Sequence, residues 1–396
     1  MTISSLSFQF LRFTVLAAAV LVVAFFGAVF AMFPGQRHAA DRLPVISAEE
    51  TEQTLAALKP PKRARPVIAI VGANEGTETT DYLVPYGVLK RSGIADVLAL
   101  GTKPGPMMMM PALTVIPDAT TDEFDRRYPE GADFVIVPAL HDSANPVVRD
   151  FIKAQAAAGA TIISICDGTL VLANAGLLDG RSATGHWFAI DGVCKAHPGM
   201  RYVRDRRYVV DRGVGTTTGI SASVPLSLTL IEAIAGRERA DAIAREVGAP
   251  GWSAAHDSGA FHLIRADVFS IAANLLTSLW HRDTVGVRVA DGVDVIALAF
   301  TADSFTRTYR SGAVAIGAGR APIKTLEGLQ IVADGSAGEV DFVVDLPGEQ
   351  PARAVDLALR EIATRYGRET ADMVRLQLEY PEASNKPVAA VTAAQE

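Results

Sequence analysis

The first half of the chain alternates short, uninterrupted apolar runs with longer segments of helical periodicity. Apolar runs of this length are typical of strands that are buried on both faces of a sheet. Strands that alternate with helices predict an α/β fold with a doubly wound, mostly parallel sheet. The runs are VIAIVGA (67–73), DVLALG (96–101), LTVIPD (113–118), DFVIVPA (133–139) and TIISIC (161–166), with helical spacing at 79–92 and 145–160.

A later α/β segment, residues 285–380, looks like a partial repeat of the first. Ala297 stands at the position that matches Asp81, and this copy ends before any corner that contains a cysteine. We therefore expect it to pair with or cap the first unit and not to repeat its chemistry. The matched segments are ADGVDVIALAFTADSF (290–305) with NEGTETTDYLVPYGVL (74–89), LQIVAD (329–334) with LTVIPD (113–118), and VDFVVDLPG (340–348) with ADFVIVPAL (132–140).

The N-terminal region carries a long apolar stretch at 13–33 that contains no charged residue. As a helix it would be long enough to cross the hydrocarbon core of a bilayer, and it predicts a single membrane span. A cleaved signal peptide is the alternative, but its apolar region would be shorter and followed by a small-x-small site. Arg12 on one side nearly balances Arg37 and Arg42 on the other, so either orientation is open, with the extracytoplasmic side favoured for the rest of the chain.

Composition shifts divide the chain into six parts. Prolines and basic residues between the apolar stretch and the first strand are typical of a stiff tether. The expected parts are an N-terminal membrane anchor at 1–36, a linker at 37–66, a main domain at 67–248, a connector at 249–284, the partial repeat at 285–380 and a loose tail at 381–396.

Charge and cysteine content exclude several classes of function. The 37 basic and 44 acidic residues give a net charge of -7, which provides no electrostatic footprint for nucleic acid. The two cysteines, Cys166 and Cys194, form neither a disulfide framework nor a C-x-x-C metal motif. We therefore predict a small-molecule ligand or substrate, no metal and no cofactor. The lipid bilayer and a second copy of the chain, in a homodimer, are the other expected partners.

The corner where the run at 161–166 meets the next helix places Cys166, Asp167 and Gly168 in succession. A tight strand-to-helix turn holds its side chain at the carboxyl edge of the sheet, where clefts form. The helix N-terminus would favour a thiolate there, and its amide groups could face a developing oxyanion. A packed, inert thiol is the alternative, because free cysteine is often fully buried.

The segment ISICDGTLVLANAGLLDGRSATGHW (163–187), together with ETTDYLVPYGVL (78–89), resembles the DJ-one/PfpI superfamily, which has the class I glutamine-amidotransferase-like fold. The resemblance covers 67–248 and is greatest to the branch that contains isonitrile hydratases and the N-terminal domains of AraC-type regulators. It implies a flavodoxin-like sandwich with a nucleophile elbow.

This resemblance also implies a site. Cys166 matches the family nucleophile, Asp81 matches the acidic residue that reaches over it, and Asp167, His186 and Glu78 complete the catalytic candidates. The implied oxyanion and cleft loop consists of Ala139, Leu140, His141 and Gly168.

Two departures from the family pattern bear on catalysis. Asp167 follows the cysteine where many hydrolytic members have histidine, and its negative charge would raise the pKa of the thiol. Ala139 and Leu140 replace the usual Gly-Gly of the loop whose backbone N–H helps to form the oxyanion hole.

Two classes of function follow. The first is a cysteine-dependent hydrolase or hydratase that acts on a small carbonyl, amide or isonitrile-like molecule. The second is a non-catalytic ligand-sensing or redox-sensing domain without a DNA-binding part. A Cys166 pKa above about 8.5, the ordinary thiol value, would argue against both the catalytic and the redox-sensing hypotheses.

Overall fold

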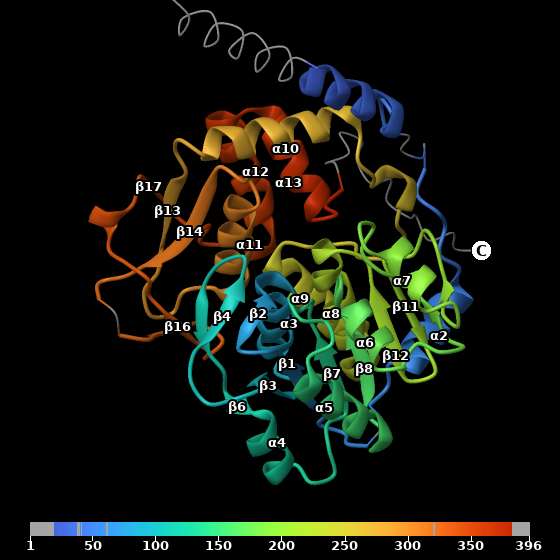
Figure 1. The fold of residues 1–396 in the computed structure, drawn as a ribbon. Coiled ribbons are helices and arrows are strands. Elements are labelled where there is room, and N and C mark those ends of the chain that lie inside the picture. The colour runs from blue at the N-terminus through green and yellow to red at the C-terminus, as the bar shows by residue number, and fades with distance from the viewer. Residues whose placement is uncertain (1–19, 38–39, 41, 61, 320, 382–396) are drawn as a thin grey trace, which may run out of the picture.

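A computed structural model describes residues 20–37, 40, 42–60, 62–319 and 321–381. Its centre is a seven-stranded sheet in which every neighbouring pair of strands is parallel except the outermost pair, β11 and β12 (Figure 1). This confirms the predicted α/β class with a mostly parallel sheet. In spatial order the strands are β11 (Tyr208–Asp211), β12 (Val214–Thr217), β8 (Thr161–Ser164), β7 (Phe134–Val137), β1 (Val67–Val71), β3 (Asp96–Gly101) and β6 (Ala119–Thr120).

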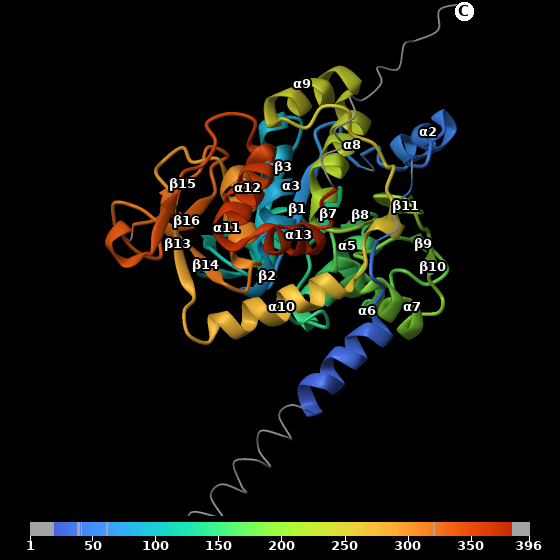
Figure 2. The ribbon, with the colours of Figure 1, turned by 90° about the horizontal axis from the view of Figure 1, so that it is seen from above.

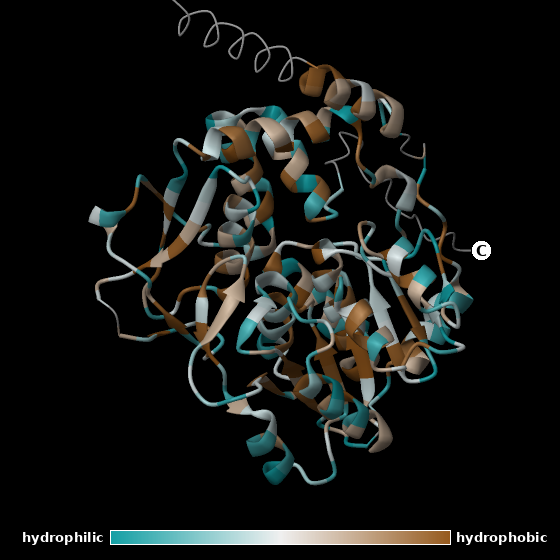
Figure 3. Ribbon diagram, in the orientation of Figure 1, coloured by the Kyte–Doolittle hydropathy of each residue, from teal (hydrophilic) through white to brown (hydrophobic). Residues whose placement is uncertain are grey.

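Both faces of this sheet are covered by helices, which explains why its strands are continuously apolar. In β1, Ile68 and Ile70 point into one hydrophobic cluster, whereas Val67, Ala69 and Val71 point into another on the opposite face. The central strands are correspondingly the most hydrophobic part of the ribbon in Figure 3. The first cluster lies under α3 (Thr79–Ser92), α8 (Ser223–Ala235) and α9 (Arg237–Val247), and the second under α4 (Thr121–Arg127), α5 (Pro146–Ala157), α6 (Gly168–Asn174) and α7 (Ile190–Ala196).

The C-terminal unit contains a second, smaller parallel sheet, in the order β14-β13-β17. This order matches β3-β1-β7 of the main sheet, with one helix again following the central strand. The elements of the unit are β13 (Asp283–Arg288), α11 (Val295–Thr306), β14 (Ser311–Ile316), β15 (Ile323–Lys324), β16 (Gln330–Val332), η3 (Ala337–Glu339), β17 (Phe342–Val344), η4 (Pro351–Arg353), α12 (Ala354–Tyr366) and α13 (Arg368–Gln377).

Short segments flank and connect the two units. The sequence predicts a connector at 249–284. This range contains α10 (Arg265–Ser278), which crosses the top of the molecule beside α13 (Figures 1 and 2). The segments are α2 (Ala48–Ala57), β9 (Ser182–Ala183), β10 (Arg201–Tyr202), η1 (Ile220–Ala222), η2 (Ser258–Ala260) and α10 (Arg265–Ser278).

The two units are joined through an approximate two-fold relation. A mixed sheet, β15-β16-β5-β4-β2, takes strands from both units, including β2 (Glu75–Glu78), β4 (Met107–Met110) and β5 (Thr114–Ile116). At its centre β5 and β16 are antiparallel. Val115 pairs with Ile331, and on either side of this pair Thr114 pairs with Val332 and Ile116 with Gln330. Helices α3 and α11 pack against each other beside this strand pair (Figure 2). The same patch of each unit therefore faces the other, as in an isologous dimer interface.

The predicted membrane anchor is contradicted. Within the ranges described, no helix is both long enough and apolar enough to cross a bilayer. Residues 20–32 are helical, and Phe26 packs against Phe269 of α10 with ring centroids 5.1 Å apart. Residues 13–19 of the predicted span, and 382–396 of the predicted tail, lie outside the described residues. Apolarity of the sequence alone was therefore an insufficient basis for the assignment.

The contact between α3 and α11 depends on the small size of Gly87. A Cβ atom at this position would lie 2.5 Å from Cγ1 of Ile296 and 2.8 Å from Cγ1 of Val295. Alanine favours helix over glycine by about 1 kcal/mol, so an open helical site would gain stability from the change. We expect Gly87→Ala to lower the free energy of unfolding instead, by about 1–3 kcal/mol, because the interface becomes overpacked.

Urea denaturation of the full chain measures this effect. Gly192→Ala is the matched control, because Gly192 lies within α7 and an added Cβ there has nothing within 4 Å. A Gly87→Ala variant as stable as the Gly192→Ala variant would contradict close packing of the two helices.

Candidate functional site

Cys166 lies at the corner between β8 and α6 in an unusual backbone conformation. Its φ angle is 55°, in the left-handed region that residues with side chains rarely adopt. The conformation is held by the Cys166 N–H, which donates to the Thr218 carbonyl and to Thr217 Oγ1, each at 3.1 Å. Gly168 begins α6 so close to the Val137 carbonyl oxygen that a Cβ atom would overlap it. The sequence Cys-Asp-Gly therefore fits a corner that admits only glycine at its third position.

Two buried carboxyl groups lie at the start of α3. Glu78 is the N-cap, and one of its oxygens accepts the Asp81 N–H at 2.6 Å. Asp81 Oδ2 accepts the Ala139 N–H at 3.1 Å, whereas Oδ1 is buried with no hydrogen-bond partner among the residues described. The Ala139 amide, which the family resemblance implies for an oxyanion hole, is thus engaged in holding Asp81.

Burial raises the pKa of both carboxyl groups. The pKa of Asp81 lies well above its ordinary value because burial disfavours the charged form and Glu78 adds negative charge. Burial and the charge of Asp303 raise the pKa of Glu78 to about 7. Burial therefore favours Asp81 as a neutral acid, and its Oδ1 has no hydrogen-bond partner within the described residues.

Arg307 provides the positive charge of the site, and it belongs to the C-terminal unit. It follows α11, donates to Glu78 at 2.7 Å and makes two hydrogen bonds of 2.9 Å to Asp303. The sequence analysis missed this residue. Had the alignment of the two units been extended by two residues, it would have matched Arg307 with Arg91, which binds the N-cap of α11 in return.

The thiol of Cys166 is neutral in this environment. Its pKa lies well above the ordinary value, first because the side chain is buried and then because Asp81, Asp167 and Glu78 add negative charge. Arg307 acts in the opposite direction but does not compensate. The N-terminus of α6, which was expected to favour a thiolate, therefore affects the thiol pKa less than burial and the neighbouring negative charges do.

His186 and Asp167 lie next to Cys166 with unused polar atoms. His186 Nδ1 is 3.8 Å from Asp167 Oδ1, and neither atom has a hydrogen-bond partner within the described residues. His186 Nε2 is 3.1 Å from the Gln377 carbonyl, which can only accept, so Nε2 carries a hydrogen. Ligand atoms of Cys166, Asp167 and His186 lie within 4.8 Å of one another, a spacing at which they could hold a metal ion.

The end of α13 covers this group of side chains. Trp187 Nε1 donates to the Leu376 carbonyl at 2.9 Å, next to the contact between His186 and Gln377. Glu379 accepts the Gly219 N–H and forms a buried pair with His256 at 2.8 Å. The positive charge of the site, on Arg307, and the segment that covers the site, Gln377 to Glu379, therefore both come from the C-terminal unit.

The predicted loop residues Leu140 and His141 have other surroundings. Leu140 is buried in the hydrophobic cluster beneath α5 and α6. His141 is exposed, and its N–H donates to the Gly76 carbonyl at 2.7 Å. The structure thus groups Cys166 with the acidic candidates and His186, and it places these two loop residues in different environments.

The raised pKa of Glu78 predicts how stability changes with pH. This carboxyl group titrates near 4.5 in the unfolded chain and at about 7 in the folded protein, so between these values the folded state binds more protons. The free energy of unfolding therefore falls as the pH rises through this window, by about 3 kcal/mol from this group. Glu78→Gln should flatten this part of the profile, as measured by urea denaturation at a series of pH values.

Glu361→Gln on the exposed face of α12 should keep the wild-type profile. A Glu78→Gln profile as steep as that of the wild type would show that Glu78 does not titrate in this window.

Comparison with known proteins relates the main domain to a family. The model of the DJ-1/PfpI family matches residues 67–233. A Parkinson disease protein 7 homolog from Danio rerio is 28% identical over 188 residues, which cover 46% of this chain and 95% of that protein. A DJ-1 superfamily protein from Salmonella typhimurium has a solved structure that is 26% identical and covers 47% of this chain and 100% of its own, with a TM-score of 0.42.

Two bacterial relatives match over shorter stretches. Isonitrile hydratase from Pseudomonas putida is 39% identical over 94 residues, which cover 24% of this chain and 40% of the enzyme. The HTH-type transcriptional regulator GbdR from Pseudomonas aeruginosa is 34% identical over 134 residues, which cover 33% of this chain and 35% of the regulator. The chain therefore spans well under half the length of these two proteins. As the sequence predicted, residues 67–233 match the DJ-1/PfpI family, and part of the chain is similar to isonitrile hydratase and to an HTH-type transcriptional regulator.

Proposed function

We propose that the Cys166 site acts on a small, neutral carbonyl, amide or isonitrile-like molecule by hydration or hydrolysis. The observation that carries this proposal is the neutral acid Asp81, held by the Ala139 N–H through one oxygen and unpartnered at the other. A buried acid of raised pKa is suited to give a proton to a reacting group at neutral pH.

A concerted addition accommodates the raised pKa of the thiol. The Cys166 sulfur would bond to the electrophilic carbon of the substrate while its proton passes to the Asp81 carboxyl group. Asp81 would give its own proton to the carbonyl oxygen of the substrate, so that S–H adds across the C=O bond, or to an isonitrile carbon, so that S and H both add to that carbon; in each case the acid is regenerated. An amide adduct would then release its amine, which takes a proton from Asp81, and leave a thioester. Water would finally displace the sulfur, and the proton would return to Cys166 through Asp81. No free thiolate is required at any point.

The charges around Cys166 favour neutral substrates. Glu78, Asp81 and Asp167 all raise the pKa of the thiol where they are ionised, and a bound anion would oppose the ionisation of each of them in the same way. The relation to isonitrile hydratase supports a small unsaturated molecule of this class.

A ligand sensor is the second candidate function, and the closed site favours it. Contacts of Gln377 and Glu379 with the main domain cover Cys166, and such a cover could report an occupied site to another protein. The relation to a regulator supports this use. Redox sensing is disfavoured, because oxidation requires an accessible thiol of low pKa.

Asp81→Asn should change thiol reactivity and turnover in opposite directions. Removal of the carboxyl group removes negative charge beside Cys166 wherever Asp81 is ionised, so in alkaline buffer the thiol pKa falls and alkylation by iodoacetamide becomes faster. Turnover of an isonitrile, a glyoxal or a small amide should fall by about 10²–10⁴-fold, because the proton donor is lost.

Mass spectrometry of the alkylated chain provides the first measurement, with Cys194 as an internal control, and product analysis provides the second. Cys166→Ser should abolish turnover. If wild-type protein turns over no member of the panel but binds one of them reversibly, the sensor function replaces the enzyme. If Asp81→Asn slows alkylation of Cys166, the assignment of Asp81 as its acidic neighbour is wrong.

A further inference from the structure

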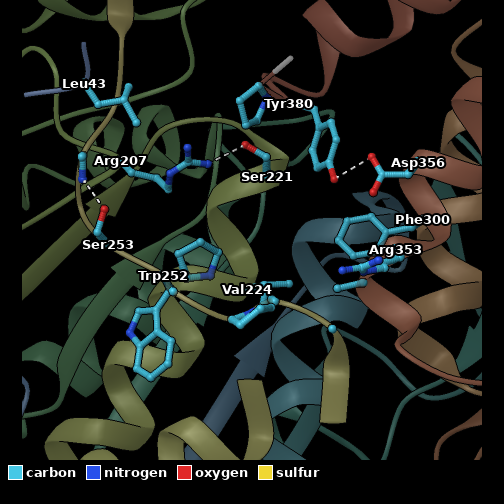
Figure 4. A pocket seen from close by; sticks show the side chains of 18 residues that line it. Leu43, Arg207, Ser221, Val224, Trp252, Ser253, Phe300, Arg353, Asp356 and Tyr380 are labelled. Carbon is cyan, nitrogen blue, oxygen red and sulfur yellow. Dashed lines mark hydrogen bonds between the residues drawn. The ribbon is translucent and has the colours of Figure 1, made fainter. Parts of the chain in front are cut away.

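A cavity of about 530 Å³ lies at the junction of the two units, outside the group of side chains around Cys166. Figure 4 shows Arg207 and Ser221 on one side, Tyr380 and Asp356 on another, and Trp252 with Val224 below them. This volume is within the range of small-molecule pockets, which often occur between domains.

Arg207 is the most unusual residue of this cavity. Its partly buried guanidinium group makes one hydrogen bond, from Nη1 to Ser221 Oγ at 3.1 Å, and forms no ion pair within the described part of the chain. By contrast, Arg307 forms ion pairs with two carboxylates and Arg91 with three, Glu246 at 3.6 Å among them. Burial lowers the pKa of Arg207, and the negative charge of Glu379, which forms no ion pair with it, offsets this effect only in part.

The remaining surfaces of the cavity limit the charge and shape of a ligand. Trp252, Val224 and Phe300 supply apolar and aromatic contact area. Asp356, whose carboxylate accepts a hydrogen bond from Tyr380 at 3.0 Å, adds a negative charge away from Arg207 (Figure 4). Arg353 also lines the cavity on the side of Asp356 (Figure 4), so the charges of these two residues offset each other and Arg207 is left as the cation available to a single carboxylate.

We infer that this cavity binds a small monocarboxylate with an apolar or aromatic body. The carboxylate accepts hydrogen bonds from the free N–H groups of the Arg207 guanidinium, and the body packs against Trp252 and Val224. This inference concerns a second site and does not depend on what Cys166 does.

The cavity nevertheless shares a wall with the Cys166 site. Thr218 accepts the Cys166 N–H, and Ser221, three residues later, lines the cavity. Ser221 Oγ also donates to the Glu379 carbonyl at 2.6 Å, and the adjacent Tyr380 is a cavity residue. A bound carboxylate would therefore contact the segment that holds the cover in place.

Isothermal titration calorimetry of the full chain with benzoate, phenylacetate and hexanoate tests the inference, with benzyl alcohol as the neutral counterpart of benzoate. At least one carboxylate should bind saturably and benzyl alcohol should bind at least about tenfold more weakly, as expected when a charged hydrogen bond is lost. Arg207→Gln should weaken carboxylate binding by a similar factor. Arg212→Gln, an exposed change on the neighbouring hairpin, should leave it unchanged.

Val224→Phe provides an independent test, because it fills the cavity and keeps Arg207. It should also weaken binding, with an unfolding transition like that of the wild type to show that the chain is folded. The inference is overturned if no carboxylate of the panel binds, if benzyl alcohol binds as tightly as benzoate, or if both Arg207→Gln and Val224→Phe bind with wild-type affinity.

Discussion

The docking of the two units depends on two reciprocal ion pairs, in each of which an arginine of one unit binds the helix N-cap of the other. Arg307 after α11 binds Glu78, the N-cap of α3, and Arg91 near the end of α3 binds Asp294, the N-cap of α11. Arg307 also pairs with Asp303, and Arg91 with Glu327, so each arginine is held by more than one carboxylate. These ion pairs therefore fix how the units dock, together with the antiparallel pair of β5 and β16.

The same ion pairs determine the chemistry that is available at Cys166. Arg307 is engaged by Glu78 and Asp303, so it only partly offsets the effects that raise the thiol pKa. Burial also raises the pKa of Asp81 and so favours its neutral, protonated form. A thiol beside a neutral acid differs from a thiolate beside a histidine base, and it favours concerted proton transfer over attack by a preformed anion.

Local patterns predicted most of the main domain. The apolar runs identified the central strands, and the Cys166-Asp167-Gly168 corner lies where a strand meets a helix, with Gly168 against the Val137 carbonyl. Arg307 and Glu379 could not be identified in this way, because they reach the site from a unit more than a hundred residues away in the chain. The membrane span was assigned from hydropathy alone, whereas the helix at residues 20–32 does not meet the length and apolarity that a span requires within the described part of the chain.

The central claim is that the C-terminal unit closes the Cys166 site, and Glu379 tests it most directly. Its carboxylate binds both the Gly219 N–H and His256, so Glu379→Ala should release the end of α13. The account predicts that iodoacetamide then modifies Cys166 faster near neutral pH, while the rate at Cys194 stays unchanged. Equal Cys166 rates in the Glu379→Ala variant and the wild type, both folded, would contradict it.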